Sequence, residues 1–152
     1  STWDTVREVL KNYRELGEEF DCFMILQPTS PLRDAGDIIA AFKLLNERNA
    51  NAVVSVCLCE HSPYWSAQLP ADGNMVVFHE LFEKCKARQL LGQPYYRLNG
   101  AIYLVCVPYF EYTPDIYTAN CFAYVMSREN SVDIDNSHDF NIAEFLIEKK
   151  QN

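Results

Sequence analysis

Two acidic residues separated by a single residue, Asp133 and Asp135, form the clearest candidate for a metal site in this sequence. If the backbone between them is extended, both carboxylates point to one side, because side chains alternate along a strand. Mg²⁺ prefers such oxygen ligands and usually takes the remaining ones from water and substrate phosphates. The pair therefore predicts a Mg²⁺ site, although two solvated carboxylates near the start of a helix explain the pattern equally well.

A second group of chemically able residues follows an apolar run, in the stretch Leu26–Arg33. Its two prolines fix their own φ angles and restrict the residues before them. Gln27, Thr29 and Ser30 therefore lie on a stiff backbone that can present an amide and two hydroxyls. Ligands of open α/β sheets bind at the carboxyl ends of the strands, where this turn is expected. A rigid strand-to-helix connection would need the same residue types.

The third group is Arg97, Asn99 and Gly100, at the start of another apolar run. Arginine binds carboxylates with two parallel hydrogen bonds. Asparagine can pair with sugar hydroxyls, and glycine permits a close backbone approach or a positive φ. The alternative is an ordinary turn into a strand with a surface arginine.

The elements that must hold these groups follow an α/β pattern. Helical spacing of apolar residues predicts helices over residues 3–16, from Asp34 or Asp37 to about Arg48, and 138–150. The last of these would bury Ile142, Phe145 and Leu146. Apolar runs predict sheet strands at 20–26, 53–59, 101–108 and 120–126, the last at an edge. The first strand is apolar on both faces, which favours a central place in a mostly parallel sheet with flanking helices.

Residues 61–95 are predicted to be an excursion from this sheet. His61–Trp65 is an aromatic loop, and Asp72-Gly73-Asn74 favours a hairpin over residues 68–78. A polar stretch that contains Arg88 and Gln89 follows. We expect this segment to contact a second copy of the chain, which would make the protein a homodimer.

Composition limits the remaining possibilities. The 152 residues fit a single domain, and a net charge of −8 argues against a nucleic-acid partner. No apolar run is long enough to span a membrane. The six cysteines include one close pair, Cys57 and Cys59, without the spacing of a metal motif. They favour reduced thiols in a cytoplasmic protein over a zinc site or a disulfide.

Three stretches resemble, in order, motifs of the acylneuraminate cytidylyltransferases, the CMP-sialic acid synthetases. They are Leu26–Arg33 (LQPTSPLR), Tyr96–Tyr103 (YRLNGAIY) and Val132–Asp135 (VDID). The resemblance implies a nucleotide-diphospho-sugar transferase-like fold. It also implies transfer of CMP from CTP to sialic acid or a related nonulosonic acid, with release of pyrophosphate.

The same resemblance suggests a role for each candidate residue. Asp133 and Asp135 would hold Mg²⁺. The sugar acid would be placed by Gln27, Arg97 and Asn99, with Gly100 along its pocket. Thr29 and Ser30 would line the floor near the nucleotide. Arg88 and Gln89 resemble an arginine–glutamine pair that the family carries in its dimerisation segment near the sugar.

The sequence also departs from the family pattern. Asn136 follows the acidic pair where threonine is usual, and no glycine-rich loop follows a strand. The chain thus resembles the C-terminal two-thirds of a cytidylyltransferase domain, without its first strand and phosphate-binding loop. We expect it to be inactive alone, and the alternative is a non-catalytic binding or dimerisation subunit of a split enzyme.

Two other enzyme classes also use an Asp-x-Asp pair. A haloacid dehalogenase phosphatase carries it after the first strand with a domain to follow, whereas 17 residues follow Asp135. A glycosyltransferase would leave the other two motifs unexplained.

Overall fold

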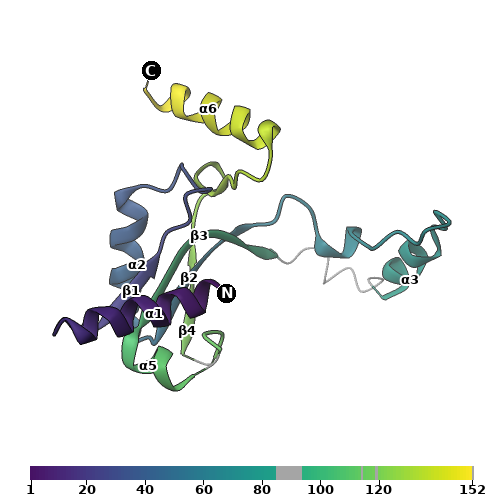
Figure 1. The fold of residues 1–152 in the computed structure, drawn as a ribbon. Coiled ribbons are helices and arrows are strands. Elements are labelled where there is room, and N and C mark those ends of the chain that lie inside the picture. Colours follow the sequence, from purple (N-terminus) through teal and green to yellow (C-terminus); the bar gives the residue numbers. More distant parts are fainter. Residues whose placement is uncertain (85–93, 114, 119, 152) are drawn as a thin grey trace.

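The computed structural model describes residues 1–84, 94–113, 115–118 and 120–151, and these form a four-stranded sheet with flanking helices (Figure 1). The strands are β1 (Cys22–Ile25), β2 (Ala52–Leu58), β3 (Tyr96–Cys106) and β4 (Cys121–Val125). The helices are α1 (Thr2–Glu15), α2 (Ala35–Arg48), α3 (Val76–Lys84), α5 (Val107–Tyr112) and α6 (Ser137–Gln151). Two short 3₁₀ turns are η1 (Pro63–Trp65) and η2 (Glu129–Ser131). The predicted α/β class is confirmed.

The sheet is mixed, so the prediction of a mostly parallel sheet is wrong. Its strand order is β1-β3-β2-β4, with β3 antiparallel to both β1 and β2, and β2 parallel to β4. The reason lies in the excursion, since Leu58 at the end of β2 faces Tyr96 at the start of β3. A strand that starts at the same end of the sheet where the preceding strand finished must run antiparallel to it. A parallel neighbour would require a crossover connection to the other end of the sheet.

The expected central position of the first strand is also wrong. β3 lies between β1 and β2, so β1 occupies one edge of the described sheet and its four residues are half-buried. The predicted edge position of β4 is confirmed.

Helices cover both faces of the sheet. On one face, Ala41 and Leu45 of α2 pack in a core with Ile102 and Leu104 of β3. On the other face, Trp3 and Val6 of α1 pack around Phe110 of α5, together with residues of β1, β2, β3 and β4. The third strand was predicted to reach residue 108, but it ends at Cys106 because α5 begins at Val107, with Pro108 in its first turn.

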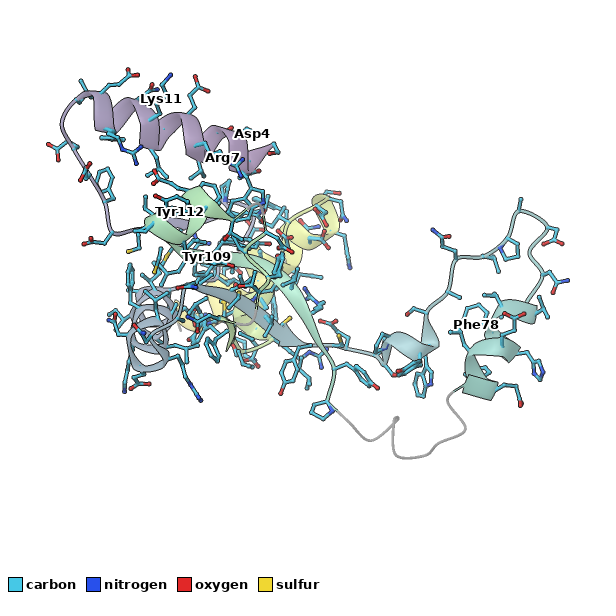
Figure 2. All side chains as sticks on the ribbon, turned by 90° about the horizontal axis from the view of Figure 1, so that it is seen from below. Asp4, Arg7, Lys11, Phe78, Tyr109 and Tyr112 are labelled. Carbon is cyan, nitrogen blue, oxygen red and sulfur yellow. The ribbon has the colours of Figure 1, made fainter. Side chains whose placement is uncertain are left out.

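The described residues 61–84 of the excursion project away from the sheet, and Figure 2 shows Phe78 far from Asp4, Arg7 and Lys11 on α1. The hairpin predicted around Asp72-Gly73-Asn74 is wrong, since the turn leads into α3. The Asn74 Oδ1 atom accepts a hydrogen bond of 2.9 Å from the Val76 amide. Asparagine thereby satisfies a free amide at the start of the helix, which a turn signal alone does not reveal.

The last helix, α6, is confirmed, but its packing is not. Ile142 and Phe145, which we expected to be buried, are 39% and 63% exposed, and Leu146 is half-buried. The helix is capped by Asn136, whose Oδ1 atom accepts hydrogen bonds from the His138 and Asp139 amides. None of the described helices combines the length and apolar character needed to cross a membrane.

Candidate active site

The turn after β1 is fixed by an arginine. The Arg33 Nη1 atom donates hydrogen bonds to the carbonyl oxygens of Gln27 at 3.2 Å and Ala101 at 2.8 Å. A further turn is closed by the Ser30 amide, which donates to the Gln27 carbonyl at 3.2 Å. The guanidinium thus fastens this turn to β3, and the two prolines restrict what remains of its freedom.

Gly100 is the point at which the three sequence motifs meet. Its φ is +73°, and a Cβ atom built there would clash with the Gln27 Oε1 atom and lie 3.6 Å from the Asp133 Oδ2 atom. Any other residue would therefore be strained and would push the Gln27 amide away. Residues far apart in the sequence, Gln27, Gly100 and Asp133, converge at one place.

Backbone contacts hold the acidic stretch around Asp133 in place. The Ile134 amide donates to the Thr29 carbonyl at 2.8 Å, which ties the acidic stretch to the turn after β1. The Asp133 Oδ1 atom is buried and has no hydrogen-bond partner among the described residues. The Ser30 Oγ atom, in a residue that is 0% exposed, is buried without a partner in the same way. Such groups are rare in folded proteins, so both are candidates for ligand or ion contacts.

The side chain of Asp135 is exposed, whereas the carboxylate of the nearby Asp139 is hydrogen-bonded within the protein. The Asp139 Oδ2 atom accepts hydrogen bonds from the amides of Asp135 and Asn136, at 3.1 and 3.2 Å. Together with the bonds that Asn136 accepts, this is a capping box, which accounts for asparagine at this position. The carboxylate of Asp139 therefore serves the start of α6.

These donors suit a hard cation. The buried, unpartnered oxygen of Asp133 and the exposed carboxylate of Asp135 could hold Mg²⁺, provided that water or phosphate oxygens supply the other ligands. The part of the chain that the structure describes contains no group of three or more His, Cys, Asp or Glu side chains able to hold a metal. A site made by the protein alone is thus not present among these residues.

Arg97 forms an ion pair, which the sequence motif did not predict. Its Nε and Nη2 atoms donate to the Glu60 carboxylate at 3.3 and 3.2 Å, and the Arg128 Nε atom lies 3.9 Å away from the same group. The hydrogen bond from Arg97 holds the pKa of Glu60 below its usual value. A carboxylate ligand of Arg97 would have to share or replace Glu60.

Asn99 is buried, with 1% of its surface exposed, and its amide is used within the protein. The Oδ1 atom accepts from the Ser55 hydroxyl at 2.6 Å and the Ala101 amide at 3.3 Å. The Nδ2 atom donates to the Ser131 Oγ atom at 2.9 Å and the Met126 Sδ atom at 3.3 Å. An asparagine amide has two donors and two acceptor positions, so none remains for a sugar hydroxyl.

The remaining predicted residues divide into two groups. Gln27 lies at the convergence point, and both Gln27 and Thr29 are half-buried. No side-chain hydrogen bond is found for either within the described ranges. Arg88 and Gln89 lie outside the described residues, so their predicted place near the sugar stays a prediction. Sequence reasoning missed Ser55 and Ser131, although a serine within the apolar run of β2 was an available signal.

Comparison with known proteins identifies several relatives that are named cytidylyltransferases or CMP-sugar synthases. The sequence matches no family model. It is 28% identical over 144 residues to the N-acylneuraminate cytidylyltransferase of Escherichia coli, which covers 94% of this chain and 34% of that protein. It is 29% identical over 151 residues to the CMP-N,N'-diacetyllegionaminic acid synthase of Legionella pneumophila, covering 97% of this chain and 62% of that protein. An N-acylneuraminate cytidylyltransferase of Streptococcus agalactiae is 30% identical over 140 residues, which is 92% of this chain and 32% of the relative.

The site and the relatives agree on a class. An α/β chain in which three motifs meet at Gly100, beside the Asp133 carboxylate, is similar over most of its length to enzymes named cytidylyltransferases. The resemblance to the acylneuraminate cytidylyltransferase family is thereby confirmed. The chain spans between about a third and 62% of the length of these relatives.

Proposed function

We propose that this chain forms the sugar-acid and metal side of a cytidylyltransferase site. The intact protein would transfer CMP from CTP to sialic acid or a related nonulosonic acid. The observation that carries the proposal is the convergence of Gln27 and Asp133 on Gly100, whose lack of a side chain leaves room for both. The similarity to enzymes named for this chemistry supports it.

In the proposed reaction, the anomeric hydroxyl oxygen of the sugar acid bonds to the α-phosphorus of CTP. The bond from phosphorus to pyrophosphate breaks, pyrophosphate leaves, and the hydroxyl proton passes to solvent. Such a transfer depends mainly on positioning and charge neutralisation. The Gln27 amide would hydrogen-bond the sugar acid, and Arg97 would attract its carboxylate at the expense of the Glu60 ion pair.

Asp133 and Asp135 would hold Mg²⁺, which when bound would neutralise charge on phosphate oxygens. The fit rests on the unpartnered Oδ1 atom of Asp133. Thr29 and Ser30 would lie at the floor of the same site. We expect the chain by itself to have little or no transferase activity, because it contains no glycine-rich phosphate loop.

Isothermal titration of the purified chain with CTP and with N-acetylneuraminate, each with Mg²⁺, tests the site. We expect binding of at least one ligand that is lost in Asp133→Ala/Asp135→Ala. The control Glu8→Ala/Glu47→Ala removes two exposed carboxylates on α1 and α2 and should bind as the wild type does. Equal binding by wild type and the Asp133/Asp135 variant would refute the proposed site.

We propose that the excursion, residues 61–95, contacts a second copy of the chain. Among the described residues of this segment, the exposed apolar side chains include Trp65, Leu69, Met75, Val76 and Phe82. Contiguous exposed apolar surface is a common feature of association sites. Sedimentation should give a dimer that Trp65→Glu weakens, and a monomeric wild type at all concentrations would contradict this.

A non-catalytic subunit remains the second candidate, because β1 pairs on one side only among the described strands. An apolar edge strand can accept a strand from another polypeptide. CMP-sugar formation by the purified chain would exclude this candidate, as well as the expectation that the chain is inactive alone.

A further inference from the structure

Three polar side chains lie in the centre of the core, on three different parts of the chain. Ser55 belongs to β2, Asn99 to β3 and Ser131 to η2, and their exposed fractions are 0%, 1% and 1%. Burying polar groups costs free energy unless all of them are hydrogen-bonded. Here they are bonded to each other, through Ser55 to Asn99 at 2.6 Å and Asn99 to Ser131 at 2.9 Å.

The first part of this network shapes the backbone at Gly100. In the pairing of β2 with β3, Val54 faces Tyr103 and Val56 faces Leu98, so Ser55 alone faces the four residues between them. The extra residues form a bulge. The Ser55 Oγ atom accepts from the Ile102 amide at 2.7 Å and donates to Asn99, which fastens the bulge at both ends. Bulges of this kind redirect side chains next to functional sites.

The second part of the network fixes the stretch that carries Asp133. Ser131 accepts a bond from Asn99 and donates one of 2.6 Å to the Ser127 carbonyl. Beyond Asp133, the Ile134 amide is bonded to the Thr29 carbonyl at 2.8 Å. Asp133 thus lies between two anchors, and one of them is Asn99.

We propose that Asn99, with Ser55 and Ser131, is a positioning residue that sets the place of the Asp133 carboxylate relative to Gly100 and Gln27. The amide reaches both the bulge and the acidic stretch, so a shift of either would be transmitted to the other. This inference rests on the proposed function in one respect: the positioned carboxylate is taken to bind a divalent cation. Partners that orient metal ligands from the second layer typically change metal affinity 10–100-fold when removed.

The test measures Mn²⁺ affinity of the full chain by electron paramagnetic resonance, and amide hydrogen exchange at Ile134 relative to Leu104. Ser131→Ala removes the hydroxyl that accepts a hydrogen bond from the Asn99 Nδ2 atom. We expect about 10-fold weaker Mn²⁺ binding and faster exchange at Ile134, with Leu104 unchanged. If that variant does not fold, Asn99→Asp keeps the shape of the side chain, replaces its donor with an acceptor and is measured in the same way.

The matched control is Phe110→Leu, which loosens the core on the α1 face of the sheet without touching the network. It should leave both readouts at the wild-type values under conditions where every variant is folded. Unchanged Ile134 exchange in Ser131→Ala would overturn the inference. Faster exchange with unchanged Mn²⁺ affinity would also overturn it, since the network would then serve stability alone.

A failure of the proposed metal site looks different. In that case, wild type and Asp133→Ala would bind Mn²⁺ equally, or neither would bind it. The exchange of Ile134 in Ser131→Ala would still decide whether the network fixes the acidic stretch.

Discussion

Helices α2 and α6 begin in the same way and end up in different surroundings. Each starts with a capping box, Asp34 with Asp37 in α2 and Asn136 with Asp139 in α6. In α2, Ala41 is fully buried and Leu45 is 8% exposed, whereas Phe145 of α6 is 63% exposed. Local sequence decides where a helix begins, but only a partner surface decides whether its apolar side is buried.

The surfaces available to the two helices explain the difference. α2 connects β1 with β2 and therefore crosses the sheet, where it contacts β2, β3 and β4. α6 follows the acidic stretch and stands apart from the helices that cover the sheet (Figure 1). Its apolar residues Phe140 and Ile147 line an open cavity of about 360 Å³ together with Pro31 and Ile134.

The largest difference between the two helices is expected when one apolar side chain is truncated in each. Leu45→Ala should lower the free energy of unfolding by about 2–5 kcal/mol, because it leaves a cavity in a packed core. Phe145→Ala should change it by less than about 0.5 kcal/mol. Urea unfolding measures both, and a loss above about 2 kcal/mol for Phe145→Ala would show that α6 is covered in solution.

The next largest effect on stability is expected from a hydrogen bond that joins α2 to β4. The Tyr124 hydroxyl donates to the Asp37 Oδ1 atom at 3.0 Å, so Tyr124→Phe should cost about 1–3 kcal/mol. Burial, and then this bond, raises the pKa of Tyr124 to about 12 from the ordinary value of 10.0. Because the folded-state pKa is the higher one, the contribution is complete below pH 10 and is lost as the pH rises towards 12. Equal alkaline unfolding curves for wild type and Tyr124→Phe would contradict this.

Removal of the α2 cap should lower the global stability, whereas removal of the α6 cap should have a local effect only. Asp34→Ala is expected to cost about 1 kcal/mol of global stability, since α2 unfolds with the core. Asn136→Ala removes an equivalent cap but should open α6 locally. Amide exchange would then be faster at Ala143 and unchanged at Leu104. Faster exchange at Leu104 would mean that α6 and the sheet unfold together.

The smallest effect concerns the far end of α6. The Lys150 Nζ atom donates to the Asn130 Oδ1 atom at 2.6 Å, and Asn130 in turn contacts Asp37. Lys150→Met should change the free energy of unfolding by less than about 0.5 kcal/mol, because the contact is exposed. A larger loss in thermal unfolding would show that α6 depends on this link to α2.

The sequence predicted local structure well and spatial order poorly. The helical spacing of apolar residues located α1, α2 and α6 within a few residues. The order β1-β3-β2-β4 was missed because it depends on where the excursion rejoins the sheet, which is a contact between Leu58 and Tyr96. The hairpin failed for a related reason, since a turn signal does not determine whether a strand or a helix comes after the turn.

The sequence predicted which residues belong to the candidate site better than it predicted what each of them contacts. The motifs named Gln27, Gly100 and Asp133, which the fold brings together. Asn99 was expected to face a sugar, but the bulge opposite Ser55 turns its amide into the core. The partner of Arg97 was missed because Glu60 lies outside the motif, two residues after the end of β2.

The closure of the excursion has one further consequence. A 2.7 Å hydrogen bond from the Cys59 amide to the Tyr95 carbonyl joins its two ends, next to the contact between Leu58 and Tyr96. The strand pairing therefore depends only weakly on the length of the chain between these ends, because each doubling of such a loop costs only about 0.6 kcal/mol. This junction is a place where evolution or an engineer can exchange one insert for another and keep the same sheet.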